Sequence, residues 1–381
     1  MTEKYQLADL CVVSESPMAL SSFTSFLVET TSNADVHLHF CSTISTSPRK
    51  LVCRQSTALL YSTAEGWLYE SLNTSPQIQL TANRDYTELT VCLSSAQVPV
   101  ELQQEQAFLQ LLRIALECRM AFNNTLSLHS ACVAFDGQAV AFTAPSGTGK
   151  STRAVAWVEG IGAQWVSGDR PALRMTPQGI TAHGVPWDGK EQVFSNLAIP
   201  LLAICEVRRA DSDFVRLRRL NAAQARAVLM QQCFVPMWDT NATAAAFATI
   251  RKLISGAFVP IYRMFCGQDV AAARTVQDIL YHHPEQIMEA LPDMKIKDGF
   301  TLRDVAGEYM VMPTGDKIES FGGTLILNET GAFFWDKFQD PVAREDVLDA
   351  LLAEYDVAPA AAEKDLDKFL EQLRSYGVLK E

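Results

Sequence analysis

The sequence lacks closely paired cysteines, long apolar runs and an excess of basic residues. Its nine cysteines include no C-x-x-C pair, which argues against a cysteine metal site and favours reduced thiols in a cytoplasm. No apolar run is long enough to span a membrane, and the charged start at residues 1–5 predicts no secretory signal. With 32 basic against 44 acidic residues the formal net charge is -12, which argues against nucleic acid as a partner.

The composition otherwise fits a globular protein of several domains. A chain of 381 residues with 48% hydrophobic residues is long enough for two or three domains. We expect an α/β (α+β) architecture, with a β-rich region and connecting helix over residues 1–124, a nucleotide-binding domain over 125–284, a linker over 285–299 and a small domain over 300–381.

The first region shows two periodic patterns. Residues 35–40 alternate apolar and polar side chains, which predicts a half-buried strand. Residues 101–122 place apolar side chains at helical spacing, which predicts an amphipathic helix leading into the next domain. Residues 1–100 alone indicate no function.

A glycine-rich segment at 144–151 reads Ala-Pro-Ser-Gly-Thr-Gly-Lys-Ser. Asp136-Gly137 upstream supplies the positive φ angles of a tight hairpin between two apolar strands, and the segment starts where the second strand ends. Residues 152–159 follow as a helix that we expect to end at Gly160. Strand, glycine loop and helix therefore come in the order of a phosphate-binding loop.

The residue types in this loop fit nucleoside triphosphate chemistry. Glycines turn backbone N–H groups toward phosphates, a lysine reaches the terminal phosphates and a hydroxyl contacts Mg²⁺. We assign the lysine to Lys150 and the hydroxyl to Ser151, whereas Ala144 replaces the first consensus glycine. The predicted cofactors are ATP and Mg²⁺, and the predicted nucleotide-binding residues are Ser146, Gly147, Thr148, Gly149, Lys150, Ser151 and Thr152.

Two further side chains are candidates for chemistry. Asp169 follows an apolar strand at 164–167, where a base or Mg²⁺-binding carboxylate would stand, although a simple turn aspartate is the alternative. His129 immediately precedes the hairpin, although a lone histidine is more often packed or solvated.

The run from Leu128-His129-Ser130 through the loop to Val166-Ser167-Gly168-Asp169 resembles the kinase core of bacterial HPr kinase/phosphorylase. The resemblance implies a phosphoenolpyruvate-carboxykinase-like nucleotide fold that phosphorylates a protein serine. It implies that His129 neighbours the phosphates and that Asp169 is the base or a Mg²⁺ contact, with Lys150 as a third catalytic residue. Gly168 replaces the first of the family's two adjacent aspartates, which leaves the identity of the base open.

Two charged segments follow the strand at 164–167. Residues 184–191 are similar to the G-x-P-W-x-G-K/E segment of HPr-kinase-like proteins and carry Asp188, Lys190 and Glu191, for which an exposed polar turn is the alternative. An arginine group either forms a solvated hairpin face or includes one residue that steadies transferred phosphate. Its members are Arg208, Arg209, Arg216, Arg218 and Arg219.

Residues 300–381 predict a winged-helix-like module. The predicted strands are 302–305, 309–312 and 324–327, and the predicted helices are 328–335, capped by Asn328, 344–355 and 361–376. The segments 306–309, 325–332 and 373–379 resemble the PqqD family, which recognises leader peptides of ribosomally made natural products.

The PqqD resemblance implies that a leader peptide adds as a strand beside the third strand and packs against the third helix. The implied peptide contacts are Thr324, Leu325, Ile326, Leu327, Asp367, Lys368, Glu371 and Arg374. Phe369 and Leu370 are better interpreted as core. A DNA-binding winged helix is the alternative, but the acidic second and third helices argue against it.

Together these signals predict a cytoplasmic ATP-dependent kinase that phosphorylates a side chain, first of all serine, of a ribosomally synthesised precursor peptide. One alternative is a nucleotide-binding chaperone that presents the peptide to a separate peptide-modifying enzyme. Another is an ATPase or a kinase with a metabolite acceptor. No membrane partner is expected, and a homo-oligomer stays open because the resembling kinases commonly assemble.

Overall fold

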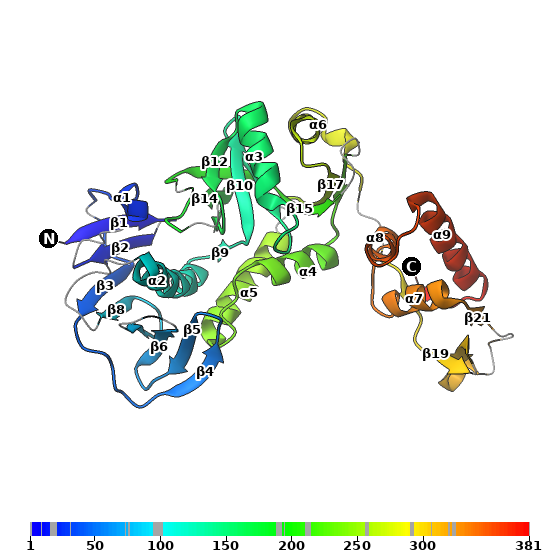
Figure 1. The fold of residues 1–381 in the computed structure, drawn as a ribbon, viewed down its shortest axis with the longest axis horizontal. Coiled ribbons are helices and arrows are strands. Elements are labelled where there is room, and N and C mark those ends of the chain that lie inside the picture. Colours follow the sequence, from blue (N-terminus) through cyan, green and yellow to red (C-terminus); the bar gives the residue numbers. More distant parts are fainter. Residues whose placement is uncertain are drawn as a thin grey trace. The chain divides into compact units, whose positions relative to one another are not determined.

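The computed structural model (Figure 1) divides into two compact units, Met1–Glu289 and Ala290–Glu381. The residues that the structure describes are 2–8, 10–15, 21–30, 32–72, 74, 77–93, 102–187, 193, 195–209, 215–255, 259–289, 293–305, 307–318, 321 and 325–380.

The first unit begins with an eight-stranded sheet of order β1-β2-β3-β8-β7-β6-β5-β4. Its elements are β1 (Glu3–Leu7), β2 (Leu10–Ser14), α1 (Ser21–Thr24), β3 (Val36–Cys41), β4 (Lys50–Arg54), β5 (Ala58–Ser62), β6 (Gly66–Ser71), β7 (Ile78–Asn83) and β8 (Glu88–Leu93). The strand predicted at 35–40 is β3, whose Val36 and Leu38 are buried while His37 is exposed. Alternation along that strand thus separates core from solvent.

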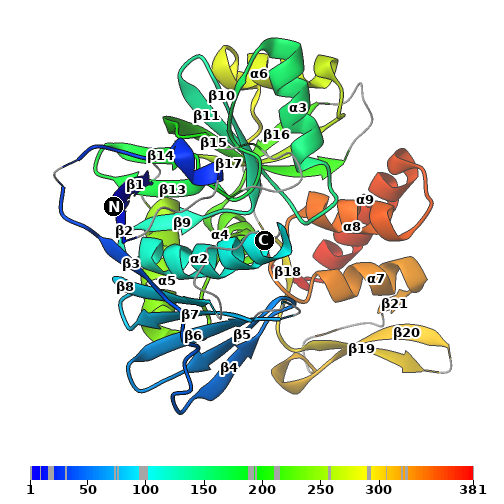
Figure 2. The same ribbon diagram turned by 60° about the vertical axis from the view of Figure 1, so that its left-hand side comes forward.

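Helix α2 (Leu102–Phe122) covers one face of this sheet and confirms the helix predicted at 101–122. It packs on β6 and β7 (Figure 2). Phe108, Leu111 and Leu112 are each 1% exposed and belong to the core beneath the sheet. The apolar stripe of the helix therefore holds the sheet against the rest of the unit.

A second, nine-stranded sheet carries the glycine-rich segment. Its main order is β12-β10-β11-β15-β14-β13-β9, and β17 joins β15 to β16. Strands β11, β15 and β17 run parallel, so their carboxyl ends lie at one edge. The elements are β9 (Thr125–Ser127), β10 (Ser130–Phe135), β11 (Gln138–Thr143), α3 (Lys150–Ile161), β12 (Gln164–Ser167), β13 (Ala172–Thr176), β14 (Gly179–His183), β15 (Ala198–Arg209), β16 (Arg216–Arg219), α4 (Ala222–Gln232), α5 (Thr240–Ser255), β17 (Ile261–Cys266), α6 (Val270–Tyr281) and the 3₁₀ turn η1 (Pro284–Gln286).

Helices cover this sheet on both faces (Figure 2). Ala131 and Val133 pack in the cluster with α3 and α6, whereas Cys132 and Ala134 pack in the cluster with α4 and α5. Strand β10 is therefore buried on both sides, which explains its continuous run of apolar residues.

The hairpin prediction at Asp136-Gly137 is confirmed, with φ angles of 46° and 74° between β10 and β11. The predicted helix end at Gly160 is wrong, because α3 continues to Ile161 and ends at Gly162 with φ 77°. A Cβ on Gly160 would lie 2.3 Å from Val270 Cγ1. That glycine permits close packing of α3 on α6 (Figure 2) and does not terminate the helix.

The second unit is a small sheet covered by three helices. Asn328 accepts a hydrogen bond from the Gly331 backbone nitrogen, which confirms the predicted cap of α7. Leu366 and Leu373 of α9 are fully buried in the core of this unit. The elements are β18 (Lys295–Ile296), β19 (Phe300–Val305), β20 (Glu308–Pro313), η2 (Gly315–Lys317), β21 (Leu325–Leu327), α7 (Glu329–Lys337), α8 (Arg344–Glu354), α9 (Pro359–Ser375) and β22 (Leu379–Lys380).

These elements make the described chain a mixed α/β protein. Within the described residues, every helix is too short or too polar to cross a bilayer.

Candidate functional site

The glycine loop, Ala144–Ser151, joins the buried strand β11 to helix α3. Gly147 and Gly149 adopt left-handed backbone conformations with φ angles of 80° and 97°. A Cβ on Gly149 would lie 2.8 Å from Gln268 Nε2 and 2.9 Å from Arg153 Nη1. The backbone angle therefore favours glycine at 149, and a larger residue would also displace the ends of these two side chains.

Lys150 lies across this loop. Its side chain is largely buried, and its Nζ donates hydrogen bonds to the carbonyl oxygens of Ala144 at 2.9 Å and Pro145 at 3.3 Å. Thr148 Oγ1 donates to the Pro145 oxygen at 2.9 Å. Ser151 is half-buried and Thr152 is exposed on the first turn of α3. The lysine ammonium and the helix start thus supply positive charge at one place.

Arg153 supports the glycine loop through hydrogen bonds. The sequence had not identified this residue as a candidate. The residue is 3% exposed, and its guanidinium donates to the carbonyl oxygens of Thr148, Gly149 and Cys266 at 3.3, 3.2 and 2.6 Å. These bonds tie the end of the loop to β17. An arginine in an otherwise apolar helix pattern was the available sequence signal.

His129 and Asp169 meet because β10 lies between β11 and β12. His129 precedes β10, and Asp169 follows β12, which pairs antiparallel with β10. The distance from His129 Nε2 to Asp169 Oδ1 is 4.0 Å, and both side chains are about one third exposed or less. Thr143 Oγ1 donates to the His129 carbonyl oxygen at 2.9 Å, so the histidine is fixed to the start of the glycine loop.

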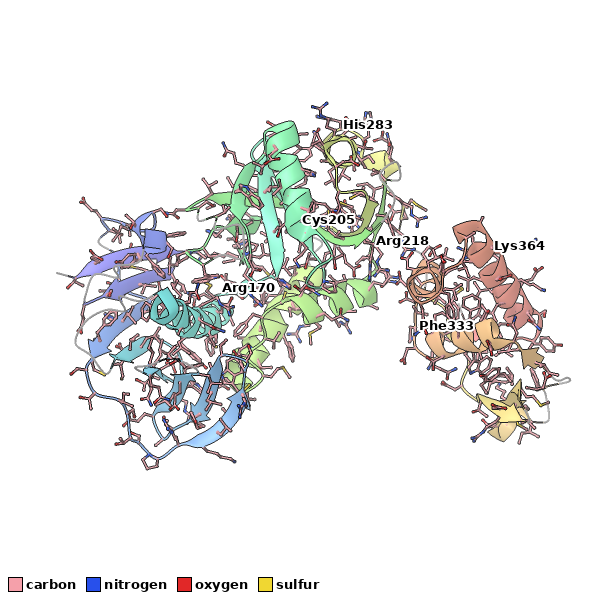
Figure 3. All side chains as sticks on the ribbon, viewed as in Figure 1. Arg170, Cys205, Arg218, His283, Phe333 and Lys364 are labelled. Carbon is pink, nitrogen blue, oxygen red and sulfur yellow. The ribbon has the colours of Figure 1, made fainter. Side chains whose placement is uncertain are left out.

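The protonation of His129 reflects these neighbours. Burial lowers the pKa of His129 below its ordinary value, the charges of Lys150 and Arg170 lower it further, and Asp169 opposes the shift. The imidazole is therefore neutral near pH 7 and can accept a hydrogen bond at one ring nitrogen. Arg170 Nε also lies 4.0 Å from Asp169 Oδ2 (Arg170 is labelled in Figure 3).

Charged side chains gather at the same sheet edge around Glu206, which the sequence analysis did not single out. Glu206 pairs in register with Thr143, the last residue of β11, and with Arg263 of β17. Its carboxylate contacts Arg263 Nε at 2.7 Å and Arg208 Nη2 at 2.8 Å. Arg218, labelled in Figure 3, is 1% exposed and pairs in register with Arg263. Two guanidinium groups thus share one buried carboxylate beside the loop, and Arg218 lies on the strand next to Arg263.

The other predicted arginines lie elsewhere. Arg216 stacks over the Phe265 ring, with Cζ 4.7 Å from the ring centroid, and Arg219 is exposed. The side chain of Arg209 lies outside the described residues. Because side chains alternate along a strand, the neighbouring Arg218 and Arg219 of β16 point to opposite sides, one buried and one exposed.

The Gly184–Trp187 segment is buried, and it runs close to the end of β12. A Cβ on Gly184 would lie 1.9 Å from the Ser195 oxygen and 2.7 Å from the Val166 oxygen. Val185 and Trp187 pack in the core of the N-terminal sheet. Asp188, Lys190 and Glu191 lie outside the described residues, so their predicted contacts have no structural description.

The side chains near the glycine loop that could hold a metal ion carry oxygen donors. Nowhere in the described ranges do three His, Cys, Asp or Glu side chains gather to hold a metal. Mg²⁺ commonly takes one or two protein oxygens and completes its octahedron with phosphates and water. Ser151 and Asp169 are the protein oxygens that such an ion would use.

The second unit contains a groove between β21 and α9, here called the β21–α9 groove. Among the described residues, strand β21 pairs only with β20, so in that part of the chain its other edge is open. The groove has a volume of about 660 Å³, and Ile326 within it is 50% exposed. Its lining residues are Ile326, Leu327, Asn328, Thr330, Gly331, Phe334, Asp365, Lys368, Phe369, Glu371, Gln372 and Ser375. An open strand edge beside an apolar floor can accept an added peptide strand.

Residues 308–379 match the protein-family model for coenzyme PQQ synthesis protein D (PqqD). This segment is a PqqD domain. Two solved structures are similar to the chain. One, described as TbiB1 in complex with the TbiA(beta) leader peptide, shows 26% identity and a TM-score of 0.20, and the similarity covers 23% of this chain and 94% of that one.

The other, described as lasso peptide synthetase B1 complexed with the leader peptide, shows 20% identity and a TM-score of 0.20. The similarity covers 23% of this chain and 99% of that one. No curated protein matches the chain.

Within the PqqD domain, the structure brings some predicted peptide contacts together and separates others. Ile326, Leu327, Lys368 and Glu371 line the groove, and Leu325 is buried one residue before it. The remaining two described contacts point to other neighbours: Asp367 Oδ1 accepts from Arg344 Nε at 2.7 Å, and Arg374 Nη2 lies 3.9 Å from Met294 Sδ. Thr324 lies outside the described residues.

On α9, three groove residues escaped the prediction. Asp365, Gln372 and Ser375 line the groove together with Phe369, which is also 5% exposed core as expected. The helical spacing of 365, 368/369, 372 and 375 was the signal that could have identified this face.

Proposed function

We propose that this protein is an ATP-dependent kinase that captures a ribosomally synthesised precursor peptide on its PqqD domain and phosphorylates a side chain of that peptide, first of all serine. One observation carries the proposal. The same chain joins a PqqD domain with an open strand edge to a glycine loop around which Lys150, His129 and Asp169 gather.

The loop residues would hold the nucleotide. Backbone N–H groups of residues 146–151 and the start of α3 would bind phosphate oxygens, while Lys150 would exchange its carbonyl partners for the terminal phosphates. Bound Mg·ATP supplies the phosphoryl group. Ser151 and Asp169 would contribute the protein ligands of the ion. The resemblance to HPr kinase/phosphorylase supports this assignment of roles.

Asp169 would orient the acceptor hydroxyl and accept its proton as the oxygen attacks the γ-phosphorus. The new O–P bond forms while the bond from that phosphorus to the bridging oxygen breaks, and ADP leaves. Lys150 would offset the charge on the transferring group. Neutral His129 would offer a further hydrogen bond, and the buried Glu206–Arg263–Arg208 group would keep positive charge close to the loop.

The PqqD domain would supply the substrate. Main-chain pairing along β21 gives affinity, and the groove gives side-chain selection. A tethered leader raises the effective concentration of the acceptor residue at the phosphate site without any new contact there. Weak intrinsic affinity of the acceptor segment would therefore suffice.

A second candidate is a peptide chaperone that binds nucleotide without transferring phosphate. Gly168 favours it, because the resembling kinases have a second aspartate at this position. Asp169 is then the single carboxylate that the described geometry places beside His129.

The test is mass spectrometry of a candidate precursor peptide after incubation with the full-length protein and Mg·ATP. We expect a phosphate-sized mass gain that Lys150→Ala abolishes. Ile326→Arg, which puts a charge in the groove, should slow the gain. Lys364→Ala, an exposed change on α9 outside the groove lining, is the matched control and should have no effect.

An unmodified peptide that nevertheless binds the wild type and not Ile326→Arg would favour the chaperone. A peptide that neither binds nor gains mass would contradict both candidates.

A further inference from the structure

We propose that Cys41 and Cys92 form a redox-active dithiol site on the eight-stranded N-terminal sheet, where a peroxide converts the two thiols into a reversible disulfide. The site lies on β3 and β8 and is independent of the proposed nucleotide and peptide chemistry. It would give a function to residues 1–100, for which the sequence indicates none.

The two cysteines face each other across neighbouring parallel strands. Cys41 is the last residue of β3 and pairs in register with Cys92, the residue before the end of β8. Neighbouring strands lie about 4.8 Å apart, which falls within the Cα separations that a disulfide spans. The two Sγ atoms are 2.7 Å apart. A disulfide places its sulfurs about 2.05 Å apart, so bond formation requires only a small movement of the side chains.

Both thiols lie on the face of the sheet that is turned away from α2. Leu38 of β3 and Val91 of β8 are buried in the core that α2 closes. Side chains alternate along a strand, so Cys41 and Cys92 point to the opposite face. A bond between them would therefore join the carboxyl ends of β3 and β8 without entering that core.

The two thiols differ in exposure, which separates their roles. Cys41 is partly exposed, whereas Cys92 is 4% exposed and lines a cavity of about 500 Å³. Burial raises the pKa of the Cys92 thiol above its ordinary value, and the contact with Cys41 raises it further. Cys92 is therefore protonated near pH 7 and is a poor first nucleophile. Cys41 would meet the peroxide first, and Cys92 would act as the resolving thiol.

Hydrogen peroxide would be the oxidant, and the reaction has two steps. The Cys41 thiol loses its proton, together with its hydrogen bond to the Thr43 carbonyl oxygen at 3.2 Å, and its sulfur attacks one peroxide oxygen. The O–O bond breaks, which leaves a sulfenic acid on Cys41 and releases water.

The Cys92 sulfur then attacks the sulfenic sulfur of Cys41. The S–S bond forms as the S–O bond breaks, and the hydroxyl group leaves as water with the proton of the Cys92 thiol. The two thiols are oxidised by two electrons in total, and the peroxide is reduced to two molecules of water. Exchange with a small dithiol reverses the change.

Cys53 provides a comparison within the same sheet. It is also partly exposed, but β7, β6 and β5 separate its strand, β4, from β8. At about 4.8 Å per strand this separation is beyond the reach of a disulfide. The remaining six cysteines of the chain are buried. Exposure and distance together therefore favour the pair of Cys41 and Cys92.

The test is peptide mapping of the full-length protein after reduction, removal of the reductant and exposure to dilute hydrogen peroxide. The protein is then denatured, and its remaining thiols are blocked with iodoacetamide. We expect two of the nine cysteines to escape alkylation. Mass spectrometry should find the Cys41 and Cys92 peptides linked, at the sum of their masses less two hydrogens, while Cys53 is alkylated. Dithiothreitol should restore both thiols.

Two variants separate the steps. Cys92→Ser removes the resolving thiol, so peroxide should leave a sulfenic acid on Cys41 that dimedone traps. Cys53→Ser is the matched control and should form the link as the wild type does. Thermal unfolding of each variant controls for folding.

The wild type alone can overturn the site. Alkylation of both Cys41 and Cys92, after a peroxide dose that oxidises free cysteine in the same solution, would do so. Conversion of Cys41 to a sulfinic acid while Cys92 stays a free thiol would also do so. Neither result would bear on phosphoryl transfer or peptide capture.

Discussion

The glycine loop of the first unit and the β21–α9 groove of the second differ in how their side chains are held. Lys150 and Arg153 are 9% and 3% exposed and are fixed by carbonyl oxygens of the loop and of β17. Ile326, Lys368 and Glu371 are exposed along the groove. A site for chemistry requires preorganised charge, whereas a site for peptide capture gains most affinity from main-chain pairing. Single substitutions should therefore have large effects at the loop and smaller effects at the groove.

The steepest expected effect is that of Asp169→Asn on phosphoryl transfer. In the proposed reaction Asp169 is the base and a Mg²⁺ ligand. The amide would keep the size of the side chain but lose both roles, so kcat should fall about 1000-fold. Peptide affinity, measured by fluorescence anisotropy with a labelled precursor, should be unchanged because the groove lies on the other unit.

The matched control for Asp169→Asn is Asp136→Asn in the hairpin turn, where asparagine also tolerates a positive φ angle. If Asp169→Asn retained full transfer activity, another group would be the base, and the assignment of Asp169 would be withdrawn.

The next largest effect is the loss of Arg153. Arg153→Ala removes the bonds to Thr148, Gly149 and Cys266 and opens a cavity under the loop, which should lower the free energy of unfolding by about 3 to 4 kcal/mol. Arg153→Lys keeps the positive charge but lacks the planar guanidinium, so it should recover only part of the lost free energy of unfolding. Urea unfolding measures both, with the exposed Arg251→Ala as control. An Arg153→Ala protein as stable as the control would show that the loop does not depend on this support.

A smaller effect is the dependence of stability on pH. The part that histidines contribute should arise in the first unit, because all six histidines of the sequence precede residue 284. Burial lowers the pKa of His183 to about 4, and Arg174 adds to the shift. Between that value and the ordinary 6.5 the unfolded chain holds a proton that the folded chain does not, so stability is lost as pH falls through this window. The loss from this residue should be about 2 to 3 kcal/mol.

His183→Leu should remove that part of the pH dependence, because an apolar side chain has no proton to gain. Urea unfolding of wild type and variant at pH 7 and at pH 4.5 measures the difference. A variant whose stability falls with acid as steeply as the wild type would assign the acid sensitivity to other groups.

Local sequence predicted those parts of the site that depend on neighbouring residues. The Asp136-Gly137 hairpin, the glycine loop and the Asn328 cap each follow from backbone preferences within a few positions. His129 precedes β10 and Asp169 follows β12. The two residues lie close together because β10 and β12 are neighbouring antiparallel strands. The PqqD domain was predicted from its motif residues and matched as a family.

Features that depend on distant pairing escaped prediction. Glu206 and Arg263 meet only because β15 and β17 run parallel in register, and the sequence does not state which strands pair. Gly160 looked like a helix end but serves the contact with Val270, 110 positions away in the chain and adjacent in space. Local preference gave way to tertiary packing in both cases.

The smallest predicted effect tests which face of α9 contacts the peptide. Asp367 and Arg374 were predicted on this face, but in the structure they do not line the groove. Asp367 bonds Arg344 of α8, whereas Asp365 and Glu371 line the groove. Asp367→Asn should cost less than about 1 kcal/mol, because the exposed pair is screened by water, and should leave peptide affinity unchanged. Glu371→Gln, the matched change inside the groove, should alter peptide affinity about twofold to fivefold by removing a charge beside the bound strand. Isothermal titration with one peptide compares the two variants. If Asp367→Asn had the larger effect on affinity, the peptide would lie against the α8 side of the helix. The contrast between the buried Lys150 and Arg153 at the loop and the exposed groove residues would then apply to that face instead.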